Sequence, residues 1–127
     1  GLPEPLRGLT AGIVLPLLAF RLGAGHAAYL ALSSRTIDAA EAHRIGLVHE
    51  LVAGDQLWVR AHALAGECAR GAPSSLQMTK QMLNETIGEQ VSTLLSAGAA
   101  VSAAARTTEA AREGLEAFRD KRPPQWP

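Results

Sequence analysis

The chain has 127 residues, in which twelve Lys and Arg residues balance twelve Asp and Glu residues, for a formal net charge of zero. This length suits one domain or a piece of a larger protein, and the scattered basic residues exclude the concentrated positive charge typical of nucleic-acid binders. The longest apolar run, residues 13–20, is far shorter than the roughly 20 residues of a membrane span, so we expect no membrane partner. Cys68 is the single cysteine, which excludes an internal disulfide and predicts a buried, inert thiol in a cytoplasmic protein.

The first third of the chain predicts a stiff loop followed by short helices. Residues 1–12 contain three Gly and two Pro, and each proline should push its predecessor, Leu2 or Glu4, toward extended geometry. Apolar residues then dominate every face from 13 to 22, which indicates a short buried helix closed by Gly23. A second helical segment is predicted over residues 26–32.

A capped helix and a short strand are expected next. Asp38 stands at an N-cap position with Glu41 three residues on, so the aspartate can accept a backbone N–H while the glutamate reaches back. Gly46 should end this helix. Residues 47–52 alternate loosely between apolar and polar types and predict a single short strand.

The remainder of the chain has a helical pattern throughout. Asp55 is predicted to cap a helix over 57–70, and Pro73 to open another that continues to about residue 88. Further helices are expected over 89–106 and 110–120, and Met78 and Met82 are expected to fill a core. We therefore predict two domains, 1–53 and 54–127. The apolar stripes of the second predict packing against the first or against other subunits.

Glu4 is the residue that most suggests chemistry. It lies between Pro3 and Pro5, and a rigid backbone is what a positioned general acid or base requires. Two other interpretations stay open at this point, because loop carboxylates are common on surfaces. Glu4 could be a solvated loop charge, or it could pair with Arg7 across a turn.

Five short motifs, in order along the chain, resemble the crotonase (enoyl-CoA hydratase/isomerase) superfamily. Each is weak alone, but their order and spacing are specific. They are the Pro-Glu loop with its two glycines (1–12), the leucine-rich turn (28–32) with the acid-capped Glu-Ala helix after it (37–42), the Gly-Leu-Val stretch (45–48), the Thr-Lys and Leu-Asn pairs (79–84), and the closing Glu-Gly, Ala-Phe and Lys-Arg-x-Pro pattern (113–123). The resemblance implies an α/β fold, the crotonase-like ββα spiral, present here mostly as its α-helical C-terminal portion with little strand.

The same resemblance implies site residues and roles. Glu4 matches the family's proton-transferring carboxylate, which acts on the acyl chain of a thioester. Gly8 and Gly12 match loop glycines; Gly12 would bring a backbone N–H near the reacting atoms, whereas Gly8 could serve the turn alone. Phe118 and Lys121 match positions that contact coenzyme A bound by a neighbouring subunit, although the spacing of Phe118 also suits a plain core residue.

The implied substrate is an acyl-CoA or an acyl group on a carrier protein, with coenzyme A or phosphopantetheine as part of the substrate and no separate cofactor. A homotrimer or a dimer of trimers is the implied assembly. The Leu-Pro-Leu-Leu run at 15–18 departs from the commoner hydratases and looks closer to a branch that serves polyketide biosynthesis. The family's oxyanion hole and partner carboxylate precede the Glu4 position, so the resemblance implies an incomplete site within these residues. A non-catalytic oligomerisation module is the alternative, and the four histidines show no metal-ligand spacing.

Overall fold

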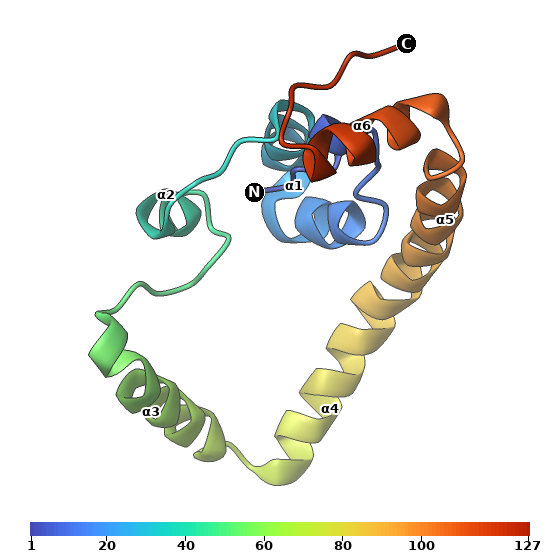
Figure 1. Cartoon of the computed structure of the whole chain (residues 1–127). Helices are drawn as coiled ribbons and strands as arrows, with labels where there is room; N and C mark the ends of the chain where they lie inside the picture. The colour runs from blue at the N-terminus through green and yellow to red at the C-terminus, as the bar shows by residue number, and fades with distance from the viewer.

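The computed structural model describes residues 1–127, the side chain of Glu89 excepted. Its regular elements within these residues are all helical (Figure 1). Two short 3-10 turns, η1 and η2, and one π-helical segment, η3, accompany six α-helices. In chain order they are η1 (Pro5–Arg7), α1 (Val14–Ser33), α2 (Ala39–Arg44), η2 (Gly54–Gln56), α3 (Leu57–Ala69), α4 (Pro73–Leu83), η3 (Asn84–Gly88), α5 (Glu89–Ala105) and α6 (Glu109–Arg119).

Helix α1 consists of two halves that meet at Gly23, as the sequence predicts. Gly23 has a φ of 76° and a ψ of 165°, a conformation that a residue with a Cβ atom rarely adopts. The whole of α1 is long and apolar enough to cross a membrane by length and composition alone. The break at Gly23 divides it, so that neither half reaches the roughly 20 residues of a span.

The predicted caps of α2 are confirmed, with one correction. The Asp38 carboxylate accepts the Glu41 N–H at 2.8 Å, and Gly46 follows the helix with a φ of 81°. The Gly46 N–H donates to the His43 carbonyl and the Leu47 N–H to the Ala42 carbonyl, the paired bonds of a Schellman ending. Glu41 does not reach back to the cap. Its carboxylate instead forms a two-pronged ion pair with Arg44.

The predicted strand over residues 47–52 is wrong. Leu47 and Val48 both donate their N–H groups to the Ala42 carbonyl, so this end of the segment is bound to α2. A strand requires a neighbouring strand to complete its hydrogen bonds, and the described residues contain none. The segment is irregular.

The largest buried cluster lies in the first 47 residues and anchors the loop that carries Glu4, while Ala111 and Ala117 of α6 are buried outside it. Leu2 and Ala11, which bracket that loop, are buried together with residues of both halves of α1. Ile37, Ile45 and Leu47 pack against this cluster from α2 and its flanks. The other members of the buried cluster are Leu18, Ala27, Leu30 and Ala31.

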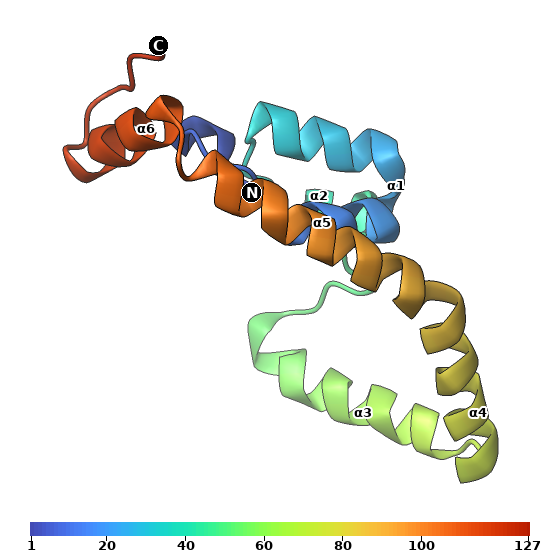
Figure 2. The ribbon, with the colours of Figure 1, turned by 90° about the vertical axis from the view of Figure 1, so that its right-hand side faces the viewer.

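Helices α3 and α4 form an arm that extends away from this core (Figures 1 and 2). No residue of either helix is buried, and all of them are described. Met78 and Met82 are therefore exposed, contrary to the predicted core role, and Cys68 is exposed rather than buried. Pro73 opens α4 as predicted, but Gln56, not Asp55, stands at the α3 N-cap, and no side-chain hydrogen bond caps that helix.

The chain runs from α4 through η3 into α5 without a break (Figure 1). The sequence predicts an end near Gly88, yet Gly88 is helical, with a φ of −67° and a ψ of −38°. Helices α5 and α6 then return to the first residues of the chain, α5 against α1 and α6 against η1. The boundary between residues 53 and 54 stays a prediction.

Candidate active site

The backbone of Glu4 is helical rather than extended, which corrects the expectation from Pro5. Glu4 has a φ of −54° and a ψ of −45°. Its carbonyl oxygen accepts the N–H groups of Arg7 and Leu9, at 2.9 Å each. These two bonds close the turn and offset the cost that a following proline imposes on helical geometry. The carboxylate is therefore held on a folded turn.

The Glu4 side chain faces a cavity and lacks a protein partner. Its Oε2 atom is buried and has no hydrogen-bond partner in the described structure. The cavity beside it has a volume of about 190 Å³. Pairing with Arg7 is wrong, because the Arg7 guanidinium lies 4.0 Å from the centre of the Phe118 ring. The cavity is lined by Glu4, residues 9–14, Ser102 and Arg106.

Gly8 forms the turn that ends η1 and also allows helix α6 to approach the backbone closely. It ends η1 with a φ of 67° and donates its N–H to the Pro5 carbonyl at 3.2 Å. A Cβ atom at Gly8 would lie 2.0 Å from the Ala110 carbonyl oxygen of the α6 helix. Across the same contact, a Cβ atom at Gly114 would lie 2.3 Å from the Arg7 carbonyl carbon. The two glycines let α6 and the Glu4 turn touch backbone to backbone.

Gly12 lines the cavity and contacts α5 in the same manner. A Cβ atom at Gly12 would lie 2.0 Å from the Gly98 carbonyl oxygen, and one at Gly98 would lie 1.8 Å from the Gly12 carbonyl oxygen. Only glycine fits at either position without backbone movement. Nearby, the Ser102 hydroxyl donates to the Thr10 carbonyl at 3.4 Å. Helix α5 thus forms one wall of the site.

Phe118 contacts the Glu4 turn through Arg7, and neither Phe118 nor Lys121 lines the cavity. Phe118 is 60 % exposed, so the alternative of a core residue is wrong for this structure; Arg7 covers one face of its ring. Lys121 has a φ of 55°, in the left-handed region that usually holds glycine. Its N–H donates to the Phe118 carbonyl, and the Arg122 N–H donates to the Ala117 carbonyl. Lys121 therefore ends α6 in a Schellman motif, and a role in binding coenzyme A stays a prediction.

The closing motif also fastens the end of the chain to α6. Both oxygens of Glu113 accept hydrogen bonds from Arg122, at 2.6 and 3.0 Å, and Oε1 accepts the Gln125 N–H at 2.7 Å. The bonds from Arg122, followed by the one from Gln125, lower the pKa of Glu113 to about 2. Glu113 is therefore ionised at neutral pH, and the motif has a structural purpose beside any binding role.

Sequence reasoning missed Ser102, Arg106 and the contact partner Gly98 as parts of the site. Small residues in α5 do predict close helix packing, but nothing in their spacing indicates which segment they contact. The contact partner is determined by the tertiary fold, in which α5 returns to the start of the chain.

The four histidines are exposed. Within the described residues, no group of three or more His, Cys, Asp or Glu side chains is placed to hold a metal ion.

Known proteins resemble this chain over nearly its whole length. The family model for enoyl-CoA hydratase/isomerase matches residues 1–127. The chain is 34 % identical over 126 residues to a putative enoyl-CoA hydratase of Thermus thermophilus, covering 99 % of this chain and 50 % of the relative. It is 36 % identical over 131 residues to the mevalonyl-coenzyme A hydratase sidH of Aspergillus fumigatus, covering 99 % of this chain and 48 % of that protein.

Solved structures agree with the fold. The crystal structure of an enoyl-CoA hydratase/isomerase from Pseudoalteromonas atlantica matches with a TM-score of 0.86 at 28 % identity, covering 98 % of this chain and 51 % of that one. A carnitinyl-CoA dehydratase from Mycobacterium avium matches with a TM-score of 0.85 at 31 % identity, covering 99 % and 51 %. The fold and the loop thus define the helical C-terminal portion of a crotonase-type protein. The chain belongs to the enoyl-CoA hydratase/isomerase family, and it spans about half the length of the curated relatives it matches.

Proposed function

We propose that this chain contributes the C-terminal portion of an enzyme that hydrates, dehydrates or isomerises acyl-CoA thioesters, with Glu4 as its acid and base. The observation that carries the proposal is the Glu4 carboxylate, which has one buried, unpartnered oxygen beside a cavity. A carboxylate that no protein group satisfies is costly unless a ligand or substrate proton engages it. Membership of the family supports the choice of thioester chemistry.

In the proposed hydration, water adds through its oxygen to the β-carbon and gives one proton to the partner carboxylate, while the electron pair of the double bond moves to the thioester oxygen as an enolate. Protonated Glu4 then gives its proton to the α-carbon, which restores the carbonyl group and leaves Glu4 ionised. Dehydration reverses these steps. In isomerisation, the ionised carboxylate removes a proton from one carbon and returns it to another. In each case the folded turn and the walls formed by α5 and α6 hold the carboxylate in place.

Stabilisation of the enolate oxygen requires two convergent backbone N–H donors. We place these donors, together with the partner carboxylate, outside residues 1–127, on the basis of the family resemblance. Coenzyme A or phosphopantetheine is part of the substrate in this proposal, and no separate cofactor takes part. Relatives named for CoA substrates support CoA over a carrier protein, and a role in polyketide biosynthesis and a cytoplasmic location stay predictions.

The test of this function is thioester turnover by the intact protein. We expect it to hydrate a short 2-enoyl-CoA, followed as the loss of the ultraviolet absorbance of the conjugated enoyl thioester. A parallel assay by chromatography and mass spectrometry detects double-bond migration, and the same acyl group on pantetheine tests the need for the nucleotide. Absence of turnover with every acyl thioester, in a folded protein, would favour the alternative of a non-catalytic oligomerisation module.

We also propose that the arm formed by α3 and α4 packs against other subunits, in a homotrimer or a dimer of trimers. Its apolar side chains support this, since Trp58 is 74 % exposed, Val59 63 % and Met82 65 %. Large apolar side chains gathered in this way usually mark contact surfaces.

In the intact protein, Trp58→Asp is expected to remove the trimer mass in light scattering, because a charge at such a contact is costly to desolvate. Gln77→Asp, a polar and exposed position on the same arm, serves as the control and should keep the mass. A monomeric wild type, or a Trp58→Asp protein of unchanged mass, contradicts this assembly.

A further inference from the structure

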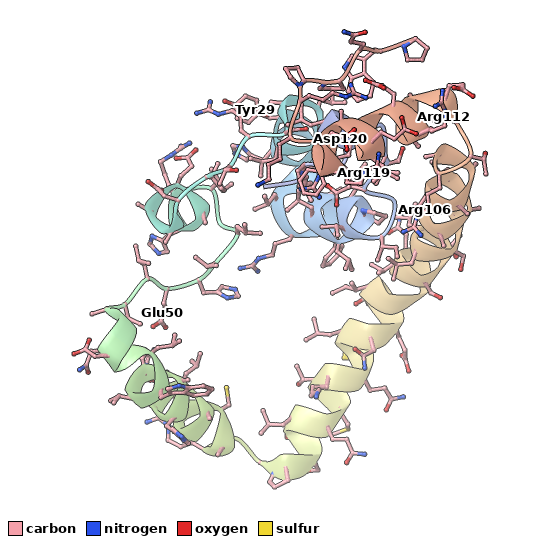
Figure 3. The ribbon with its side chains drawn as sticks, in the orientation of Figure 1. Tyr29, Glu50, Arg106, Arg112, Arg119 and Asp120 are labelled. Atoms are coloured by element: carbon pink, nitrogen blue, oxygen red, sulfur yellow. The ribbon has the colours of Figure 1, made fainter. Side chains whose placement is uncertain are left out.

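The cavity beside the Glu4 carboxylate is also lined by a basic residue, the exposed Arg106. Arg106 follows the last residue of α5 and lines the cavity together with Ser102, one turn earlier on the same helix. Figure 3 shows Arg106 on the side of α5 that faces the first residues of the chain. Glu4 and Arg106, both fully described, form no ion pair with each other. The cavity therefore presents two opposite charges with space between them.

The guanidinium of Arg106 is unusual among the arginines of this chain because it has no partner. Most others do: Arg60 binds Glu50 and Glu67, Arg112 binds Glu109, and Arg7 stacks on Phe118. Within the described structure, only Arg70 and Arg106 lack a side-chain hydrogen bond, ion pair or aromatic contact. Arg70 ends the exposed helix α3, far from any candidate chemistry, whereas Arg106 faces the candidate site.

The size of the cavity indicates which part of a thioester would meet Arg106. The part of the site that these residues form has a volume of about 190 Å³, enough for an acyl group of a few carbons. Glu4 must lie next to the α-carbon to move a proton, and the phosphates of coenzyme A are separated from that carbon by the whole pantetheine arm. An anion within reach of both Glu4 and Arg106 is therefore on the acyl group.

We propose that Arg106 determines specificity by binding a carboxylate on the acyl chain, so that the preferred substrate is a dicarboxylic acyl thioester. This inference rests on the proposed function and goes beyond it in naming the substrate class. An arginine and a carboxylate match in geometry, since two N–H groups can bind two oxygens. A fixed cation also offsets the cost of bringing a substrate carboxylate out of water into the site. The Ser102 hydroxyl lies on the same wall and can donate to that group if it gives up its long bond to the Thr10 carbonyl.

Two thioesters that differ by one carboxylate test this. Crotonyl-CoA carries a methyl group where glutaconyl-CoA carries a carboxymethyl group, and both have the same conjugated double bond. With the intact wild-type protein, we expect kcat/KM to be higher for glutaconyl-CoA. Arg106→Gln should lower the ratio of the two kcat/KM values by about 10- to 100-fold, the range for loss of a hydrogen-bonded charged partner. Arg106→Lys should restore part of the ratio, and Arg70→Gln should leave it unchanged.

Each other outcome has a distinct meaning. An equal fall in kcat/KM for both thioesters would assign Arg106 to the coenzyme A portion or to the fold, and an unchanged ratio would remove it from the site; either result overturns the inference. Thermal unfolding of each variant separates a loss of fold from a loss of binding. A wild type that turns over crotonyl-CoA without a preference for glutaconyl-CoA overturns the inference alone. Turnover of neither thioester, in a folded wild type, also overturns the inference, and it overturns the proposed function only if every other acyl thioester fails as well.

Discussion

Glu4→Gln in the intact protein is expected to lower thioester turnover by at least about 100-fold while leaving ligand affinity nearly unchanged. Glutamine keeps the shape of the side chain and its hydrogen-bonding reach, but it can neither give nor take the proton. The backbone of the turn should not respond, because Pro3, Pro5 and the two bonds to the Glu4 carbonyl hold it independently of the side chain.

Stability provides a second readout for the same variant. Because Oε2 of Glu4 is buried without a partner, removal of the charge should not lower the free energy of unfolding, and a small rise is expected. A carboxylate retained for structure would behave in the opposite way. A fall in turnover combined with unchanged or higher stability therefore assigns Glu4 to chemistry.

Glu85→Gln is the matched control, since Glu85 is exposed on η3 and accepts its hydrogen bond from Gln81. It should change neither turnover nor stability. Turnover in Glu4→Gln equal to that of the wild type would remove the proposed acid and base role.

Local signals in the sequence predicted most of the helices and their ends. Asp38 accepts a backbone N–H within its own helix, and Gly23 and Gly46 adopt the positive φ values that glycine allows. Each of these depends on residues within a few positions of one another, so the sequence contains the whole cause. The Glu4 loop was identified in the same way, through a short motif.

The sequence predictions that are wrong concern residues whose hydrogen-bonding or packing partners are far away in the sequence or missing from this chain. Residues 47–52 have a pattern suited to a strand, but a strand forms only when another chain segment completes its hydrogen bonds. Gly88 was expected to end a helix, yet nothing in the fold requires a turn there, and the helix continues into α5. Residue type predicts Cys68 and the two methionines to be inside, but the rest of this chain buries no residue of α3 or α4. Arg106 was missed because its significance depends on a cavity formed by segments about a hundred residues apart.

The contact between Gly12 and Gly98 shows the same dependence on distant residues, and it gives the largest expected effect on stability. Gly98→Ala should lower the free energy of unfolding by about 1–3 kcal/mol or more, the scale for overpacking in a well-packed interior. The reason is geometric, because the new Cβ atom would lie 1.8 Å from the Gly12 carbonyl oxygen and 2.7 Å from its carbonyl carbon. Backbone atoms cannot rotate aside as a side chain can, so α5 must move away from the Glu4 loop.

Such a movement should also widen the cavity and lower turnover, since Ser102 and Arg106 lie on α5. Gly12→Ala should have a similar effect, because its Cβ atom would lie 2.0 Å from the Gly98 carbonyl oxygen. The double variant should cost less than the sum of the two, because one displacement of α5 relieves both clashes. Denaturant unfolding of the wild type, the two single variants and the double variant measures the change in the free energy of unfolding for each.

Gly66→Ala is the control with the opposite expected sign. Gly66 lies within α3, and a Cβ atom there would meet no atom within 4 Å. Alanine should therefore raise the free energy of unfolding by about 0.5–1 kcal/mol, through helix propensity and reduced freedom of the unfolded chain. If Gly98→Ala were as stable as Gly66→Ala, α5 would not pack on the loop, and the cavity that links Glu4 with Arg106 would not exist in solution. The proposed catalytic carboxylate and the proposed specificity residue thus depend on one backbone contact between two glycines.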